Sequence, residues 1–234
     1  MTFVLIHGAW HGGWCWRFVR PLLGNHAVFA PSLTGLGERK HLAGPSVDLE
    51  THINDVVNLL EMEDLRDVVL VGHSYGGMVV TGAADRARPR IKRLVYLDAF
   101  VPEDGKCVLD YVVPERAARM REEGERTGSV SPPPLSLWGV TRQEHIDFIK
   151  PREVRHPYGC FSQNIQLMNA PMGARSFIYC STPATGSFDQ FKAKYRSDTS
   201  WRFYELETGH DAMILMPQRV AEILLEQTDP GAGG

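Results

Sequence analysis

The chain has 234 residues, of which 43% are hydrophobic and 23% charged, a balance typical of one globular domain with a modest insertion. Its formal net charge of −3 is too close to zero to favour a nucleic-acid-binding protein or a polybasic membrane anchor. The apolar run Phe3–Ile6 is followed at once by a histidine and a glycine, so we expect neither a signal sequence nor a membrane span. The four cysteines show no metal-type spacing and suit reduced thiols, which predicts a cytoplasmic location.

Short β-rich runs alternate with helical patterns in the N-terminal part of the chain. Strands are predicted over 3–6 and 26–30, the first ending at a glycine-rich loop. Apolar residues then recur at helical spacing over 48–60, and a strand, a helix and another strand are predicted over 68–71, 78–88 and 94–97. These repeated β-α-β units predict a mostly parallel sheet with helices on both faces, whose functional groups gather at the carboxyl ends of the strands.

The pattern changes after Pro102. The following segment is rich in charge and proline and contains helical pieces such as 115–123, so we predict an inserted helical cap over 103–175. The earlier alternation of strands and helices then resumes. Strands are predicted over 176–180 and 202–206, and a helix over 218–227. The core is therefore expected to comprise 1–102 and 176–234, ending in a loose Gly-Ala-Gly-Gly tail.

The strand predicted over 68–71 leads into Gly72-His73-Ser74-Tyr75-Gly76 and then a helix. This G-x-S-x-G pattern, between a strand and a helix, predicts a tight turn that lifts the Ser74 hydroxyl above the sheet. Gly72 and Gly76 are expected because side chains there would collide with neighbouring backbone. The helix N-terminus behind Ser74 favours a developing negative charge, so Ser74 is the candidate nucleophile.

A serine hydroxyl needs a base, and nine histidines are available. His210 lies between the last predicted strand and the last predicted helix. In hydrolases of this topology, the catalytic histidine follows the nucleophile and the acid in chain order and occupies that loop. His210 is therefore the predicted base.

The tetrahedral oxyanion of acyl transfer also needs hydrogen-bond donors. The candidate donors are two backbone N–H groups. One belongs to Tyr75, directly after the nucleophile, and the other to Ala9, in the loop after the first strand. His7 and His11 in the same loop have no third ligand in view, so we expect no metal there.

Three stretches together resemble the α/β-hydrolases, and within them the plant methylesterase and hydroxynitrile lyase group with its bacterial esterase relatives. They are F-V-L-I-H-G-A-W-H-G-G-W-C-W over 3–16, V-L-V-G-H-S-Y-G-G-M over 69–78 and T-G-H-D-A-M over 208–213. The resemblance implies the α/β-hydrolase fold and a cofactor-free serine hydrolase with a small helical cap. The lyases have a threonine and a lysine where this chain has Gly8 and Asp211, and cyanohydrin cleavage needs that lysine, which argues against lyase activity.

The plant enzymes place the triad acid after the strand that follows the cap, where this chain has no carboxylate before Asp189. Asp98 ends the strand that follows the nucleophile unit along the chain. Because neighbouring parallel strands lie about 4.8 Å apart, its carboxylate should be level with the Ser74 turn and within reach of the His210 loop. We therefore predict Asp98 as the acid, with Asp189 as the alternative.

These residues predict a serine hydrolase that cleaves a small, uncharged or aromatic carboxylic ester through an acyl-enzyme intermediate. Trp10 and Met213 are candidates for the pocket wall. A lactone, thioester or C–C bond hydrolase on the same triad, and a non-catalytic ligand receptor that keeps the fold, are the alternatives. The expected partner is a small-molecule ester, without nucleic acid or membrane, and a homodimer through the cap or an edge strand is compatible with the sequence.

Overall fold

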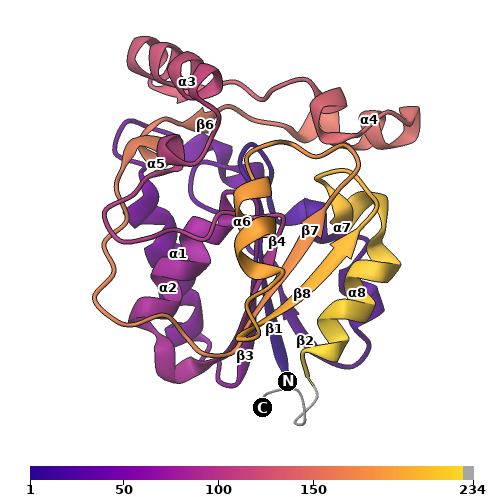
Figure 1. Ribbon diagram of the computed structural model, residues 1–234. Coiled ribbons are helices and arrows are strands. Elements are labelled where there is room, and N and C mark those ends of the chain that lie inside the picture. Colours follow the sequence, from indigo (N-terminus) through magenta and orange to yellow (C-terminus); the bar gives the residue numbers. More distant parts are fainter. Residues whose placement is uncertain (229–234) are drawn as a thin grey trace.

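The computed structural model describes residues 1–228, and its centre is a six-stranded sheet in the order β2-β1-β3-β4-β7-β8 (Figure 1). Every neighbouring pair is parallel, which confirms the predicted α/β architecture. β3 is buried along its whole length, as expected of a strand covered on both faces. The six strands are β1 (Thr2–Ile6), β2 (Ala27–Phe29), β3 (Val68–His73), β4 (Ile91–Leu97), β7 (Arg175–Cys180) and β8 (Trp201–Leu206).

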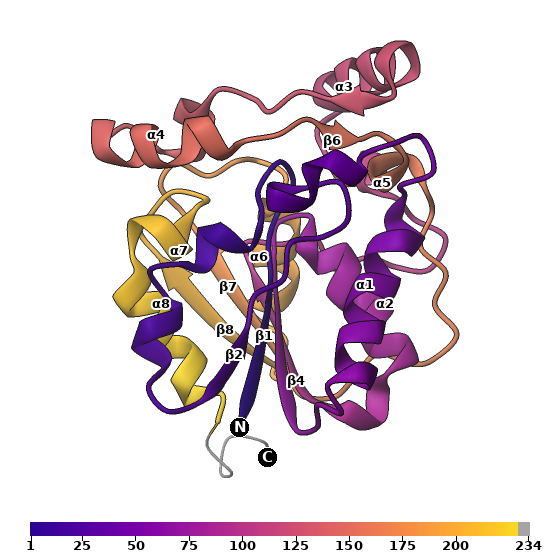
Figure 2. The same ribbon diagram turned by 180° about the vertical axis from the view of Figure 1, so that it is seen from behind.

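Helices cover both faces of the sheet. Helices α1 (Leu49–Met62) and α2 (Gly76–Arg86) lie on one side, and α8 (Pro217–Glu226) lies on the other (Figures 1 and 2). Helix α6 (Asp189–Tyr195) packs on β7, where the Phe191 and Phe177 ring centroids are 6.1 Å apart. The short helix α7 (Ala212–Leu215) precedes α8.

The segment between β4 and β7 lies above the carboxyl ends of the strands (Figures 1 and 2). It contains α3 (Pro114–Thr127), α4 (Gln143–Ile149) and α5 (Gly159–Ser162). It also contains an antiparallel pair that the sequence pattern did not predict, β5 (Ser129–Val130) with β6 (His156–Pro157).

Within residues 1–228, no helix is long and apolar enough to cross a membrane. The tail expected over 231–234 lies outside the described residues.

The turn from β3 into α2 requires glycine at two positions. A Cβ atom on Gly72 would lie 2.6 Å from the carbonyl oxygen of Gly76, and a Cβ atom on Gly76 would lie 2.8 Å from the carbonyl oxygen of His7. Both contacts are with backbone, which cannot rotate away. The structure thus confirms the reason given above for the two glycines of G-x-S-x-G.

Replacing Gly72 by alanine is expected to destabilise the protein, because the new methyl group overlaps the backbone of the turn. We expect a loss of about 2 kcal/mol in the free energy of unfolding, measured by urea denaturation. Gly44→Ala is the matched control, since a Cβ atom there meets nothing within 4 Å, and it should change stability by less than about 1 kcal/mol. Equal losses in the two variants would contradict this account.

Candidate active site

Ser74 occupies the turn between β3 and α2 in a backbone conformation that few non-glycine residues adopt. Its φ is +53°, in the left-handed region. Its N–H donates to the Leu97 carbonyl at 3.2 Å, and its own carbonyl accepts from the N–H groups of Gly77 and Phe100 at 3.0 and 3.2 Å. These hydrogen bonds hold the serine at the carboxyl end of β3.

The register of the sheet brings Asp98 beside this turn. β3 pairs with β4, with His73 opposite Leu97, so the residue after β4 lies next to Ser74. Asp98 is fully buried and has a φ of +42°. Its N–H donates to the Ile178 carbonyl at 2.7 Å, and its Oδ1 accepts from the N–H of Cys180 at 3.2 Å.

His210 lies in the loop between β8 and α7, and its Nδ1 is 2.7 Å from Oδ2 of Asp98. The loop is held by the His210 N–H, which donates to the Trp138 carbonyl at 2.9 Å, and by the His210 carbonyl, which accepts from Nε2 of His73 at 3.0 Å. Asp189 lies elsewhere and accepts a hydrogen bond from the Tyr179 hydroxyl. Of the two candidate acids, the structure therefore pairs Asp98 with His210.

Burial decides the charge state of the histidine. It lowers the pKa of His210 to about 4, although Asp211 acts in the opposite direction, and Arg116 adds to the lowering. Burial also raises the pKa of Asp98, while the hydrogen bond from Cys180 opposes this effect. Both carboxylate oxygens of Asp98 have donors, which favours the ionised form. At neutral pH His210 is thus an uncharged ring with its Nδ1–H directed at a carboxylate.

Two backbone N–H groups are free to bind an oxyanion. Within residues 1–228, neither the Ala9 N–H nor the Tyr75 N–H donates to a protein acceptor. Both residues line the same cavity as Ser74. Trp10, which follows Ala9, has a φ of +63° and donates its N–H to Nδ1 of His156 at 3.3 Å, so this hydrogen bond helps to hold the loop conformation.

Ser74 and His210 face a narrow cavity of about 20 Å³, roughly the room of one water molecule. No hydrogen bond joins the two side chains directly in the described part of the chain, as is common before substrate binds. Trp10, one of the two predicted wall residues, lines this cavity. Met213, the other predicted wall residue, is fully buried on α7 and does not line it, because α7 turns that side chain into the core.

Arg116 on α3 is a cavity residue that sequence reasoning missed. It is partly buried, and its guanidinium carbon lies 5.9 Å from the centroid of the Trp10 ring. Burial lowers the pKa of Arg116, which still leaves it positively charged. It is the one cavity-lining residue with a permanent charge among those that the structure describes.

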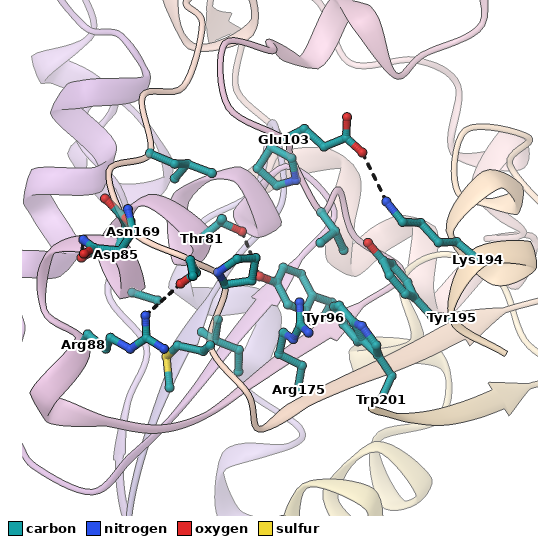
Figure 3. A pocket seen from close by; sticks show the side chains of 18 of the residues that line it. Thr81, Asp85, Arg88, Tyr96, Glu103, Asn169, Arg175, Lys194, Tyr195 and Trp201 are labelled. Carbon is teal, nitrogen blue, oxygen red and sulfur yellow. Dashed lines mark hydrogen bonds and ion pairs between the residues drawn. The ribbon is translucent and has the colours of Figure 1, made fainter. Parts of the chain in front are cut away.

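A larger cavity, of about 210 Å³, lies between α2 and α6 (Figure 3). Neither Ser74 nor His210 lines it. Two of its cations are engaged, since Lys194 lies 3.2 Å from Glu103 and Arg88 donates to the Ala170 carbonyl at 2.7 Å. The cavity with the reactive groups is therefore the smaller one.

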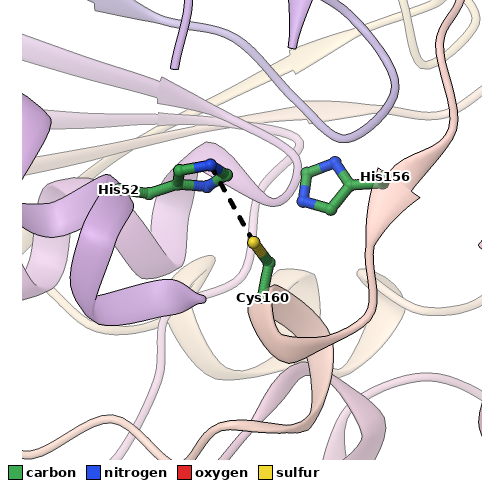
Figure 4. Close-up of side chains that lie close together, drawn as sticks. All are labelled: His52, His156 and Cys160. Carbon is green, nitrogen blue, oxygen red and sulfur yellow. Dashed lines mark hydrogen bonds between the residues drawn. The ribbon is translucent and has the colours of Figure 1, made fainter. Parts of the chain in front are cut away.

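Three buried side chains could in principle hold a metal ion. The possible ligand atoms of His52, His156 and Cys160 lie within 4.8 Å of one another (Figure 4). However, both ring nitrogens of His52 are already engaged, Nδ1 with the Tyr75 hydroxyl at 2.9 Å and Nε2 with the Thr34 carbonyl at 2.8 Å. The group fits a packed support behind Tyr75 better than a metal centre.

His7, the first of the two histidines in the loop after β1, also has hydrogen-bond partners at both ring nitrogens. Its Nδ1 donates to the Gly8 carbonyl at 2.8 Å, and its Nε2 accepts from the N–H of Leu33 at 3.0 Å. It therefore holds the loop rather than offering a free ligand atom.

Comparison with known proteins identifies the family of the chain. A model of the alpha/beta hydrolase family matches residues 3–223. A carbendazim hydrolyzing esterase from Nocardioides sp. (strain SG-4G) is 39% identical over 237 residues, which cover 95% of this chain and 98% of the relative. Methylesterase 2 of Arabidopsis thaliana is 36% identical over 253 residues, which cover 97% and 95%.

A solved structure with a similar fold is an extracellular alpha/beta-hydrolase from a Paenibacillus species. It has a TM-score of 0.83 at 24% identity, covering 100% of this chain and 99% of that one. These matches confirm the resemblance that the three motifs predicted. The chain belongs to the alpha/beta hydrolase family.

Proposed function

We propose that the protein hydrolyses a carboxylic ester through an acyl-enzyme intermediate on Ser74. The observation that carries the proposal is the 2.7 Å hydrogen bond between His210 and the buried Asp98, at a cavity that Ser74 also lines. Both full-length relatives described above are named as esterases, which supports ester hydrolysis.

The reaction proceeds in two steps. Ser74 Oγ attacks the ester carbonyl while Nε2 of His210 takes the hydroxyl proton, and the N–H groups of Ala9 and Tyr75 hold the oxyanion. His210 then gives the proton to the leaving alcohol, which departs and leaves the acyl group on Ser74. A water molecule, deprotonated by His210, releases the acid and restores the serine.

The substrate is a small uncharged or aromatic ester with a small alcohol. The narrow cavity and its aromatic wall, which includes Trp10 and Trp138, favour a compact apolar acyl group. Because the space holds roughly one water molecule, an ester can enter only if the segment between β4 and β7 shifts, so this segment acts as a cap over the core. Asp211 beside His210 offers no cation to a departing cyanide, which argues against lyase activity.

A fluorophosphonate probe tests the proposal directly, because it labels only an activated serine. The wild-type protein is expected to label at Ser74 and to turn over small methyl and aryl esters, and Ser74→Ala is expected to do neither, with a loss of roughly 10⁶ in kcat. Thioesters and lactones are assayed beside the esters, and faster turnover of one of them would identify a different acyl substrate. A folded wild-type protein that neither labels nor hydrolyses any ester would rule the proposal out.

The assignment of the acid is tested by two matched substitutions. Asp98→Asn is expected to lower kcat by about 10⁴, since the ring loses the carboxylate that fixes its tautomer and stabilises the imidazolium. Asp189→Asn, which removes a carboxylate bonded to Tyr179 instead, should change kcat less than tenfold. Ester turnover of the purified variants measures both, and a large loss confined to Asp189→Asn would reverse the assignment.

The pH dependence of kcat/KM reports the protonation of His210. Since burial lowers the pKa of this ring from 6.5 to about 4, the base is available above that pH and is lost as the pH falls through it. We therefore expect kcat/KM to be flat from pH 8 down to about pH 6 and to decline only at lower pH. An acid limb centred at or above pH 6.5 would contradict this expectation.

A further inference from the structure

A second buried acid–base pair, His11 and Asp211, lies close enough to the Asp98–His210 pair to interact with it electrostatically. Asp211 is 0% exposed and His11 is 1% exposed. Nε2 of His11 is 3.4 Å from Oδ2 of Asp211, and Nε2 of His73 is 3.9 Å from Oδ1 of the same carboxylate. A carboxylate at this depth requires a compensating charge.

His11 supplies that charge. Its Nδ1–H donates to the Ala9 carbonyl at 2.8 Å, so in the neutral ring a bare Nε2 lone pair would face the carboxylate. Burial lowers the pKa of His11, but Asp211 overcomes this effect and leaves the pKa above 6.5. Burial raises the pKa of Asp211, yet His11 holds it at about 2. The 3.4 Å separation and the directions of the two pKa shifts favour an ion pair between His11 and Asp211.

The pair connects the two loops that form the reactive site. Asp211 directly follows His210 in the chain, while the other end of His11 holds the carbonyl of Ala9 in the oxyanion loop. Trp14 stacks on the His11 ring with centroids 5.0 Å apart and keeps it in place. A change of charge at either member of the pair is therefore transmitted to His210.

The other titratable or charged groups that face this cluster come from several elements. They are His7, Cys15, His73, Asp98, Arg116, Glu153 and Cys180. Cys15 and Cys180 are buried thiols whose pKa values burial raises well above 9.0, so they stay neutral. Burial lowers the pKa of His73 well below 6.5, so this ring is neutral too.

We propose that His11 and Asp211 are positioning residues that set the charge balance at His210, an inference that rests on the proposed ester hydrolysis. The Asp211 carboxylate favours the imidazolium that forms when Ser74 attacks. Burial keeps the resting His210 ring neutral, and the His11 imidazolium offsets part of the opposing effect of the Asp211 carboxylate. The pair also holds the oxyanion loop and the histidine loop at a fixed separation.

The two charges act on His210 in opposite senses, which gives a test that a purely structural role cannot mimic. Asp211→Asn removes the negative charge, so the acid limb of kcat/KM should move to lower pH by about 1 unit, with a lower plateau. His11→Asn removes the positive charge and keeps an N–H near the position of Nδ1, so the limb should move to higher pH. Because burial neutralises His11 once the Asp211 carboxylate is removed, the double variant should match Asp211→Asn.

Asp189→Asn is the matched control and should leave the limb where it is in the wild type. The inference would be overturned if the acid limb of kcat/KM did not move in either folded single variant. It would also be overturned if the limb moved in the same direction in both. Because wild-type labelling at Ser74 is measured separately, such a result leaves the ester hydrolase itself intact. Loss of labelling and turnover in the wild type would instead refute the proposed function.

If the substituted proteins do not fold, a measurement on the wild-type protein still tests the inference. NMR of the ¹⁵N-labelled histidine rings at pH 7 is expected to show one imidazolium, His11, among the buried rings of the site, with His73 and His210 neutral. A neutral His11 ring at pH 7 would overturn the inference.

Discussion

A buried hydrogen bond between Nδ1 of His210 and Oδ2 of Asp98 holds the reactive site together, at a distance of 2.7 Å. Neither group is stable there alone, because a lone carboxylate at this depth would protonate and a free ring could adopt the wrong tautomer. The bond depends on the sheet: β4 lies beside β3, which carries Ser74, and beside β7, whose Cys180 N–H binds the other carboxylate oxygen. The chemistry is thus a consequence of strand order.

Backbone strain is concentrated at the same place. Three of the five non-glycine residues with positive φ in the described part of the chain are Trp10, Ser74 and Asp98. They follow β1, β3 and β4, which are consecutive strands in the sheet. Such conformations cost of order 1–3 kcal/mol each and persist where surrounding structure enforces them. The parallel sheet supplies that enforcement and presents the loop, the hydroxyl and the acid to one cavity.

Ser74 and His210 could be predicted because each belongs to a short pattern that prescribes a local backbone. Asp98 needed one more step, the adjacency of two strands, which the β-α-β alternation supplied. Arg116 was out of reach, since α3 carries several arginines and only its packing decides which one faces the cavity. The His11–Asp211 pair was missed for the same reason: both residues were noted, but sequence spacing does not reveal contacts between distant loops.

The proton between His210 and Asp98 offers the most direct test of this account. A short hydrogen bond between a buried ring and a carboxylate gives a far-downfield ¹H NMR resonance. We expect such a resonance in the wild-type protein, its loss in Asp98→Asn and its retention in Asp189→Asn. A downfield resonance that survives Asp98→Asn in a folded protein would contradict the account.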